Sequence, residues 1–320
     1  MRRGRARTES AVSATADLLA DRGAAAAGPD FFRSAEFMAA EGVTHTLRIS
    51  DGGSQMLAPL VVREIDSTDA LDATSPYGYP GIDAQQGSRL DPDRVDWSGT
   101  GLVSLFLRHR LGAEPPLTGA TVRNQVQIAD PALPRKSRPS DRQQIRRNAE
   151  RGYAVSRIPG PAASDGDRAG LLAAYEQTMQ RAGAEGRYFF GDEYFTGILA
   201  FEDCSLFLAM EPGGEVAAGS IAVRSDGMLH YYLSGTADRF LVDSPMKNLV
   251  AAIVDFAEDS GLPLNLGGGI EPGDPLEEFK RGFANREQAW HSSEIVCDQE
   301  KYRRLTAGKS AADFFPAYRA

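Results

Sequence analysis

The sequence contains little of what covalent or metal-dependent catalysis requires. Its two cysteines, Cys204 and Cys297, exclude a disulfide framework, leave a single bridge open, and are most simply two buried small hydrophobic residues. The four histidines are scattered without metal-ligand spacing and no cysteine cluster accompanies them, so we expect no metal site. No G-x-S-x-G motif is present to hold a serine nucleophile, and a covalent intermediate is therefore not expected.

Long hydrophobic runs are also missing. No apolar stretch approaches the length of a membrane span. The stretch Ala11–Ala27 is interrupted by Asp17, Asp21 and Arg22, so it lacks the apolar core of a signal peptide. These features predict a cytoplasmic protein with no membrane span, in which residues 1–29 form a loosely ordered N-terminal segment.

Positive charge is in the minority, because 35 lysines and arginines stand against 44 acidic residues and give a net charge of −9. This balance argues against a protein that coats DNA or any nucleic acid along its length, but it permits a local basic site. The candidate is a predicted helix over Asp141–Gly152, where arginines four residues apart form two basic flanks. These arginines are Arg142, Arg146, Arg147 and Arg151. A phosphate-binding patch is one interpretation, and a solvated helix facing the acidic remainder is the other.

The chain has the composition of an ordinary globular protein, with 42% hydrophobic and 25% charged residues. In the first half, Phe31–Glu41 predicts a short helix. A hairpin follows, with strands over Val43–Ser50 and Gln55–Ile65 joined by the turn residues Asp51-Gly52-Gly53. Further strands are expected over Gly101–Leu111 and Thr121–Ala129.

A proline-rich basic segment, Asp130–Ser140, is the best candidate for a domain boundary. Ser140 then makes a plausible N-cap for the basic helix, with Gln143 completing a capping box. A second helix is expected over Arg168–Ala182. The predicted organisation is a first domain over 30–139, a second over 140–300, and a C-terminal tail over 301–320 that packs back on the first domain.

The second half predicts a β-meander, one helix and one more strand. The helix is opened by Ser244-Pro245, and Gly267-Gly268-Gly269 follows the last strand without a helix directly after it, so a dinucleotide-binding motif is rejected. The strands are Cys204–Met210, Glu215–Arg224, Met228–Gly235 and Pro263–Leu266. This order of elements resembles the acyltransferase core of the GNAT type.

Four segments together resemble a more specific family, the Fem-like (FemABX) aminoacyltransferases. The segments are Ser75–Gly81; the basic helix with Ile145–Gly152; Tyr175–Ala184 with Tyr188–Phe190 and Tyr194-Phe195; and Tyr231–Thr236 with Ser244-Pro245, Gly267–Gly269 and Phe279-Lys280. The founding members of the family add amino acids from aminoacyl-tRNA to cell-wall peptide precursors. The resemblance implies an α+β fold of two tandem GNAT-like domains, each a mostly antiparallel sheet flanked by helices.

The resemblance also implies an activity. The chain is expected to move an amino acid from aminoacyl-tRNA to the free amine of a small peptide-like acceptor, either a peptide natural-product intermediate or a cell-wall precursor. Aminoacyl-tRNA would be the co-substrate, with no further cofactor, and the four arginines of the basic helix would contact its phosphates.

An acyl-CoA-dependent N-acyltransferase is the alternative. Acetyl-CoA enzymes of the GNAT type hold the pyrophosphate in a glycine-containing turn whose N–H groups point at the anion. The corresponding turn here, Ala237–Pro245, contains Arg239 but no glycine, and its Asp238 and Asp243 would repel a diphosphate. The sequence therefore disfavours CoA at this position.

Lys280 is the first candidate for catalysis, with Phe279 supporting its position. Transfer from an activated ester requires orientation and stabilisation of the oxyanion more than a strong base. The resemblance implies that Lys280 supplies the positive charge. The alternative is an ordinary surface lysine paired with Glu277 or Glu278.

The remaining candidates are substrate-binding residues, each with a plainer structural interpretation. Tyr77 and Tyr79, on a glycine-spaced loop, could line a peptide groove or pack the turn. Arg187, beside Tyr188, could bind an acceptor carboxylate.

Two further candidates lie in the second half. Tyr232, on the polar face of a strand, could face the acceptor or water. Gly268 could allow close approach of a substrate or form a tight turn.

Overall fold

The computed structural model describes residues 12–309 and 314–320, and the chain divides into two compact units. The first unit comprises Met1–Ala27, Gly42–Thr121 and His291–Ala320, and the second comprises Gly28–Glu41 and Val122–Trp290. The predicted boundary at residues 139 and 140 falls inside the second unit. The reason is that β7 (Thr121–Ala129) pairs with β12 (Leu264–Gly267), so the chain has joined the second unit before the proline-rich segment.

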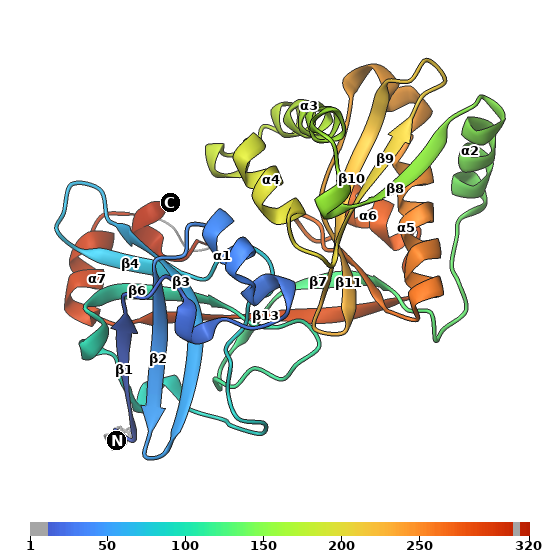
Figure 1. The fold of residues 1–320 in the computed structure, drawn as a ribbon. Helices are drawn as coiled ribbons and strands as arrows, with labels where there is room; N and C mark the ends of the chain where they lie inside the picture. The colour runs from blue at the N-terminus through green and yellow to red at the C-terminus, as the bar shows by residue number, and fades with distance from the viewer. Residues whose placement is uncertain (1–11, 310–313) are drawn as a thin grey trace, which may run out of the picture. The chain divides into compact units, whose positions relative to one another are not determined.

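The first unit is built on a mainly antiparallel sheet with the strand order β5-β1-β2-β3-β4-β6-β13 (Figure 1). The predicted hairpin is β2–β3, and Asp51 pairs with Ser54 across its tight turn. Buried Leu47, Leu60 and Leu105 belong to the core of this sheet. The strands are β1 (Ala14–Leu19), β2 (His45–Asp51), β3 (Ser54–Glu64), β4 (Leu71–Thr74), β5 (Val95–Asp96), β6 (Leu102–Arg108) and the end of β13 (Arg286–Val296).

The N-terminal segment corrects the prediction of loose order over residues 1–29. Residues 14–19 form β1, which pairs antiparallel with β2 from Thr15↔Ser50 to Leu19↔Thr46. The carboxylate of Asp17 also accepts from Arg48 on β2. Asp17, one of the residues that break the hydrophobic run, is therefore a position of a strand, and Asp21 and Arg22 follow that strand. Residues 1–11 lie outside the described residues.

The C-terminal tail closes on two strands of the same unit. It contains α7 (Gln299–Thr306) and a short 3-10 turn, Ala317–Arg319. The hydroxyl of Tyr318 lies 2.6 Å from that of Ser104 on β6. Arg319 donates to both carboxylate oxygens of fully buried Asp72 on β4, at 2.6 and 3.0 Å. These contacts fix the last residues against the first unit's sheet.

The second unit carries a sheet with the order β7-β12-β11-β10-β9-β8, in which only β11 and β12 run parallel. The predicted meander is β9–β10–β11, and each end lies within one residue of the predicted one. Its strands are β8 (Ala154–Pro159), β9 (Cys204–Met210), β10 (Val216–Ser225) and β11 (Met228–Thr236). Its helices are α1 (Ala35–Ala40), α2 (Pro139–Glu150), α3 (Asp165–Arg181), α4 (Asp192–Leu199), α5 (Met246–Ser260) and α6 (Pro275–Arg281).

Helices cover both faces of this sheet, with α3 on one face and α5 on the other (Figure 1). A Cβ at Gly235 of β11 would come within 2.3 Å of the backbone of Ala174, so the close approach of α3 requires glycine there. On the opposite face, Ala218 and Leu229 pack with Ile253 of α5. The mainly antiparallel strands of both units, together with the helices, confirm the predicted α+β class. None of the helices in the described part of the chain is long and apolar enough to cross a membrane.

Two helix starts differ from the predicted ones. The helix α2 begins at Pro139, with Arg138 at the N-cap and no side-chain cap, so Ser140 does not cap it. Proline is favoured at this first position because it has no N–H to leave unsatisfied. Ser244 has a left-handed backbone (φ 48°) and does not cap α5 either, since it ends the preceding 3-10 turn Asp238–Asp243.

Candidate active site around Lys280

Lys280 is a buried cation whose partner is a backbone carbonyl. Its side chain projects from α6, the residue is 9% exposed, and Nζ donates a 2.6 Å hydrogen bond to the carbonyl oxygen of Gly268. The alternative of a surface lysine paired with a neighbouring glutamate is therefore wrong. Glu277 is paired with Arg281, and Glu278 lies 3.0 Å from Arg138.

The short helix α6 forms here because Asp274 caps it. One oxygen of the Asp274 carboxylate accepts from the backbone N–H of Glu277 at 2.7 Å, and the other accepts from Ile270 at 2.6 Å. Pro275 occupies the first helical position, where a missing N–H costs nothing. Asp274 thus fixes both the glycine-rich turn and the helix that carries Lys280. Sequence reasoning missed this role, although an aspartate followed by proline is a helix-start signal.

The glycine turn has two separate steric requirements. Gly267 has a left-handed backbone (φ +78°), and a Cβ on it would lie 3.1 Å from Nζ of Lys280. A Cβ on Gly268 would lie 2.3 Å from the side chain of Asn124, a residue of β7. Asn124 also donates a 3.0 Å hydrogen bond to the carbonyl of Gly269. Asn124, which sequence reasoning did not select, therefore lies directly against the turn that receives Lys280.

Burial lowers the pKa of Lys280 to about 8, and the nearby negative charge of Asp274 only partly opposes this. A lysine with this pKa is mainly protonated at neutral pH and loses its charge above about 8. An ammonium has three N–H donors, and one of them goes to Gly268. Nothing else in the described part of the chain is found to accept from Nζ. The site can therefore offer positive charge and hydrogen bonds to an oxygen that gains charge during a reaction.

Phe279, next to Lys280 on α6, packs towards the core of the second unit. It is partly buried against the hydrophobic cluster that includes Leu249 and Leu266. Its ring centroid lies 5.6 Å from that of Phe283. This packing holds α6 against the sheet.

Tyr232 is part of a polar network within an aromatic cluster. The hydroxyl of Tyr194 on α4 donates to Glu41 at 2.6 Å and lies 2.8 Å from the hydroxyl of Tyr232. The Tyr232 ring packs edge-on against Phe31 and Phe32. The water-facing interpretation of this strand face is thereby corrected for Tyr232, which is half-buried. Sequence reasoning missed Glu41 and Tyr194 as its partners.

The other predicted substrate residues lie in more open places. Arg187 is exposed, 3.1 Å from Glu185, and its guanidinium lies over the ring of Tyr188 at 5.1 Å. Tyr77 is exposed and Tyr79 half-buried on the loop between β4 and β5, which belongs to the first unit, whereas Lys280 belongs to the second. The structure therefore does not bring all the candidates into one unit.

The four arginines of the basic helix are all exposed on α2 or directly after it, and three have partners in the chain. Arg146 pairs with Glu150 at 2.8 Å, Arg151 pairs with Asp243, and Arg142 donates to the carbonyl of Ser137. The Arg146–Glu150 pair is exposed and contributes about 0–1 kcal/mol, so a phosphate can replace Glu150 at little cost, whereas Asp243, the partner of Arg151, is mostly buried. Arg147, the fourth arginine of the basic helix, is exposed on α2.

Side chains of α2 contact the turn before α5, which corresponds to the turn where acetyl-CoA enzymes of the GNAT type hold pyrophosphate. The backbone carbonyl of Asp243 accepts from Asn148 at 2.7 Å and from Gln144 at 3.0 Å. Asn148 also donates to Asn248 in the first turn of α5, at 2.8 Å. These hydrogen bonds satisfy polar groups around the start of α5.

The charges at this turn correct one expectation. Asp238 pairs with Arg181 and Asp243 with Arg151, so both carboxylates that were expected to repel a diphosphate are neutralised by arginines. Lys247, in the first turn of α5, lies 2.9 Å from Asp141 of α2.

The described residues form neither a disulfide nor a group of metal ligands. Cys204 and Cys297 are both free, so the single bridge that the sequence left open is not formed. Burial raises the pKa of Cys297 to about 12, which keeps its thiol protonated. Within residues 12–309 and 314–320, no three His, Cys, Asp or Glu side chains lie close enough to hold a metal ion.

Comparison with known proteins identifies the fold. Residues 135–281 match the family of acetyltransferase (GNAT) domains, and no curated protein matches the chain. The crystal structure of FemX is similar with a TM-score of 0.54 at 11% identity, covering 81% of this chain and 89% of FemX. L-PGS from Bacillus licheniformis gives a TM-score of 0.53 at 12% identity, covering 76% of this chain and 82% of that one.

A third similar structure is the C-terminal DUF2156 domain of a protein from Agrobacterium fabrum described as a lysylphosphatidylglycerol synthetase. Its TM-score is 0.55 at 12% identity, and the match covers 88% of this chain and 92% of that domain. At such identities the likeness is one of fold. The resemblance predicted from the sequence is confirmed at that level, because the chain has the Fem-like GNAT fold.

Proposed function

We propose that this GNAT-fold acyltransferase moves an amino acid from aminoacyl-tRNA to the free amine of a peptide-like acceptor and forms a peptide bond. The observation that carries the proposal is the buried ammonium of Lys280, held by the carbonyl of Gly268 just beyond the end of β12. The fold shared with FemX supports it, since Fem-like proteins use this donor.

The proposed reaction requires little acid or base chemistry. The acceptor amine forms a C–N bond at the ester carbonyl, and the C–O bond to the terminal ribose of the tRNA breaks. The proton lost by the amine ends on the ribose oxygen. Lys280 donates to the carbonyl oxygen while it carries negative charge, and Gly268 keeps the ammonium in place. Phe279 positions Lys280 through its packing.

The turn before α5 supports tRNA over CoA as the donor. Acetyl-CoA enzymes of the GNAT type use a glycine-containing turn whose N–H groups point at the diphosphate, and the turn Ala237–Pro245 has no glycine. The exposed arginines of α2, Arg142, Arg146, Arg147 and Arg151, are the proposed contacts for tRNA phosphates. The proposed acceptor contacts are Tyr232, Arg187 and Tyr188 of the second unit. Tyr77 and Tyr79 of the first unit stay sequence-based predictions, and the space beside Gly268 is taken by Asn124.

The acceptor is a small peptide-like amine, and two sources match this chemistry. One is a peptide intermediate of natural-product (antibiotic) biosynthesis, and the other is a cell-wall peptide precursor. Both present a free amine on a peptide backbone, so both belong in the assay.

The experiment is a transfer assay with total charged tRNA carrying labelled amino acids, with and without RNase, and small peptide amines as acceptors. The proposal predicts labelled peptide product that disappears with RNase and with Lys280→Ala. The matched control is Lys301→Ala, which removes an exposed lysine from α7 and should leave the yield unchanged. Product formation that resists RNase would contradict the proposal.

An acyl-CoA-dependent N-acyltransferase is the second candidate. The observation in its favour is the match of residues 135–281 to acetyltransferase domains. The same assay separates the two, because label carried over from acyl-CoA, indifferent to RNase, would establish this candidate in place of the first.

A further inference from the structure

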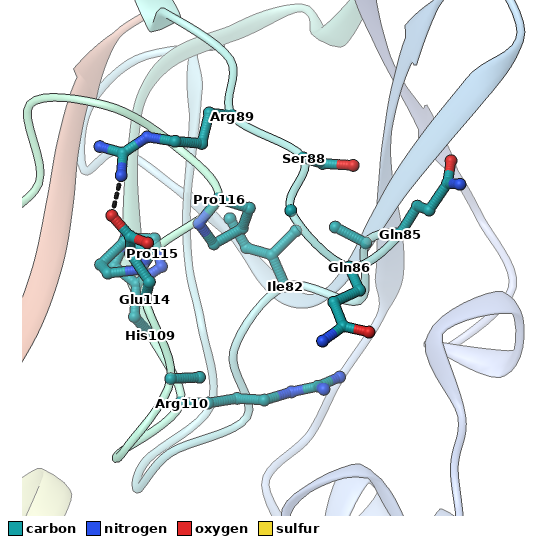
Figure 2. A pocket seen from close by; sticks show the side chains of 13 residues that line it. Ile82, Gln85, Gln86, Ser88, Arg89, His109, Arg110, Glu114, Pro115 and Pro116 are labelled. Atoms are coloured by element: carbon teal, nitrogen blue, oxygen red, sulfur yellow. Dashed lines mark ion pairs between the residues drawn. The ribbon is translucent and has the colours of Figure 1, made fainter.

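The cavity of the first unit, about 570 Å³ in volume, has balanced charges. Arg89 pairs with Glu114 at one side of it, as Figure 2 shows, and Arg110 lies 3.2 Å from Asp83. Both arginines of the lining therefore already have a carboxylate partner. Lys280 in the second unit differs from them, because its hydrogen-bond partner is a neutral carbonyl although carboxylates lie close to it in the same helix.

Arg281, the residue after Lys280 on α6, contacts three carboxylates. It pairs with Glu277, one turn earlier on the helix. Its Nη2 lies 3.2 Å from Oε1 of Glu287 on β13, and its Nη1 lies 3.4 Å from Oε1 of Glu278. The Glu277 side chain is 6% exposed, whereas those of Glu278 and Glu287 are 47% exposed. One guanidinium therefore neutralises a buried carboxylate and two open ones.

The buried carboxylate, Glu277, is a neighbour of Lys280 on the helix surface. Residues three apart in a helix have Cβ atoms about 5–6 Å from each other. Oε1 of Glu277 faces Arg281, and Oε2 accepts a 2.9 Å hydrogen bond from the backbone N–H of Gly273. Both oxygens of Glu277 thus have partners other than the ammonium of Lys280.

Glu287 is held from a second side. Its Oε1 accepts a 3.2 Å hydrogen bond from the side-chain amide of Gln127, which is 1% exposed on β7. Gln127 is paired in the sheet with Gly267, and a Cβ on this glycine would lie 3.1 Å from Nζ of Lys280. Arg281 is therefore connected, through Glu287, to the strand that lies beside the Lys280 site.

The other charged groups around α6 are accounted for as well. The carboxylate of Asp274 raises the pKa of Lys280, against the larger effect of burial, which lowers it to about 8. Arg123 of β7 is exposed. The charged groups on the neighbouring segments form pairs of their own, which are Arg138 with Glu278, Arg286 with Asp130, and Lys247 with Asp141.

Loss of the Arg281 guanidinium would leave Glu277 charged and buried without its cation. Removing one partner of a buried ion pair is strongly unfavourable, because the remaining charge is uncompensated. The ammonium of Lys280, three residues later on the same helix, is then the cation within reach. Pairing with Glu277 would raise the pKa of Lys280 and place a negative charge against the group that a substrate oxygen requires.

We propose that Arg281 is a positioning residue that keeps Glu277 from pairing with Lys280. It neutralises Glu287 in the same way. The ammonium is thereby left for the oxygen that gains charge during transfer. This role in transfer rests on the proposed function, whereas the effect on the ammonium is independent of the donor. Two measurements therefore test the proposal separately.

The first measurement is NMR titration of the Lys280 ammonium in the full chain with isotope-labelled lysine, assigned with Lys280→Met. Arg281→Gln should raise the pKa of Lys280 by about one unit or more from its wild-type value of about 8. Adding Glu277→Gln to this variant should restore the wild-type value. Glu277→Gln alone should change the pKa little, because a carboxylate already neutralised by Arg281 contributes little to it.

The second measurement is the single-turnover rate of transfer at pH 7 and saturating donor. Arg281→Gln should lower this rate by about tenfold or more, and its alkaline decline should move to higher pH. The double variant Arg281→Gln with Glu277→Gln should recover most of the rate. Arg281→Lys keeps the positive charge and should stay closer to the wild type than Arg281→Gln does.

A matched control separates this role from a general effect of charge. Arg135 is another arginine of the second unit that contacts two carboxylates, those of Asp255 and Glu258. Arg135→Gln should leave the pKa of Lys280 unchanged. Thermal melting of each variant reports its folding, and Glu277→Gln alone decides the question where Arg281→Gln does not fold.

Three results would overturn the proposal. They are an unchanged or lowered pKa of Lys280 in folded Arg281→Gln, a raised pKa that Glu277→Gln does not reverse, and a pKa lowered by about one unit in Glu277→Gln alone. Absence of transfer by the wild type would overturn the proposed function instead, and the titration would still decide whether Arg281 keeps Glu277 from Lys280.

Discussion

The ammonium nitrogen of Lys280 and the carbonyl oxygen of Gly268, twelve residues apart in the chain, lie 2.6 Å from each other. A buried lysine more often faces a carboxylate, yet the two adjacent glutamates of α6 bond to arginines. A neutral carbonyl orients the ammonium without cancelling its charge. The ammonium therefore keeps its charge for a substrate. Burying this charge lowers the stability of the folded state.

The first prediction concerns this cost. The pKa of Lys280 falls from 10.5 to about 8 on folding, so the unfolded chain binds more protons between these values and stability rises with pH through this window. At pH 7 the full penalty is present, about 3 kcal/mol at 1.36 kcal/mol per unit. Lys280→Met should abolish transfer and yet raise the free energy of unfolding at pH 7, with the gain fading by pH 10. Urea denaturation at both pH values measures this, and a destabilised variant at pH 7 would contradict it.

The second prediction concerns the pH dependence of transfer. Lys280 must be protonated to stabilise an oxyanion, so the single-turnover rate should fall as pH rises through about 8. Lys280→Arg keeps its charge at every accessible pH and should lose this alkaline decline even if its overall rate is lower. The rate is followed from pH 6 to 9.5 and corrected for spontaneous ester hydrolysis. An identical decline in the arginine variant would remove Lys280 as its origin.

The third prediction concerns Asn124 as a positioning residue. Its amide contacts the glycine turn that receives Lys280, and misplacement of a catalytic group by about 1 Å can cost up to roughly 100-fold in rate. Asn124→Ala should lower kcat by at least about tenfold with little change in KM. NMR of the Lys280 ammonium should show a pKa closer to 10.5, because the loosened site admits water. Val122→Ala, an exposed neighbour on the same strand, is the control and should change neither quantity.

The fourth prediction concerns the basic helix. Replacing both Arg146 and Arg147 by glutamate should raise KM for aminoacyl-tRNA and reduce the salt dependence of binding by about one unit of slope per lost phosphate contact. The Lys280 chemistry at saturating donor should be unchanged. Replacing both Arg303 and Arg304 of α7 by glutamate is the control with the same change in net charge. A salt slope equal to the wild-type value would show that α2 does not contact the tRNA.

The fifth prediction concerns the network at Tyr194. Its hydroxyl donates to Glu41 at 2.6 Å, whereas the hydroxyl of Tyr232 lies 3.4 Å from the same oxygen. Tyr194→Phe should therefore cost about 1–3 kcal/mol of stability, as expected for a hydrogen bond to a charged group, and Tyr232→Phe should cost less. Chemical denaturation gives both values, and the reverse order would contradict the network as described.

The sequence predicted the parts of the fold that depend on local signals. The strands Cys204–Met210 and Thr121–Ala129 end at the predicted residues because apolar runs and turn residues mark both ends. The strand Ala14–Leu19 was missed because Asp17 within it looks like an interruption of a hydrophobic run. The helix carrying Lys280 was missed because seven residues give no periodic pattern, although Asp274-Pro275 marks its start.

The site was only partly predictable for a related reason. Lys280 was selected through a family resemblance, but its partner Gly268 and the adjacent Asn124 meet only when β7 pairs with β12, more than a hundred residues away. The pairing of Arg151 with Asp243 likewise joins α2 to the turn before α5 across 92 positions. Contacts at such separations are set by tertiary packing, which no local pattern encodes.

In the proposed reaction, the buried and charged Lys280 stabilises the carbonyl oxygen while an aminoacyl group moves from tRNA to the acceptor amine. The most direct test is the single-turnover rate with purified, labelled aminoacyl-tRNA and a peptide amine, measured for the wild type and for Lys280→Ala with excess acetyl-CoA present. The account predicts rapid transfer by the wild type, no inhibition by acetyl-CoA, and loss of at least about 100-fold in the variant. Equal rates for the two proteins, or transfer only of the acetyl group, would contradict it.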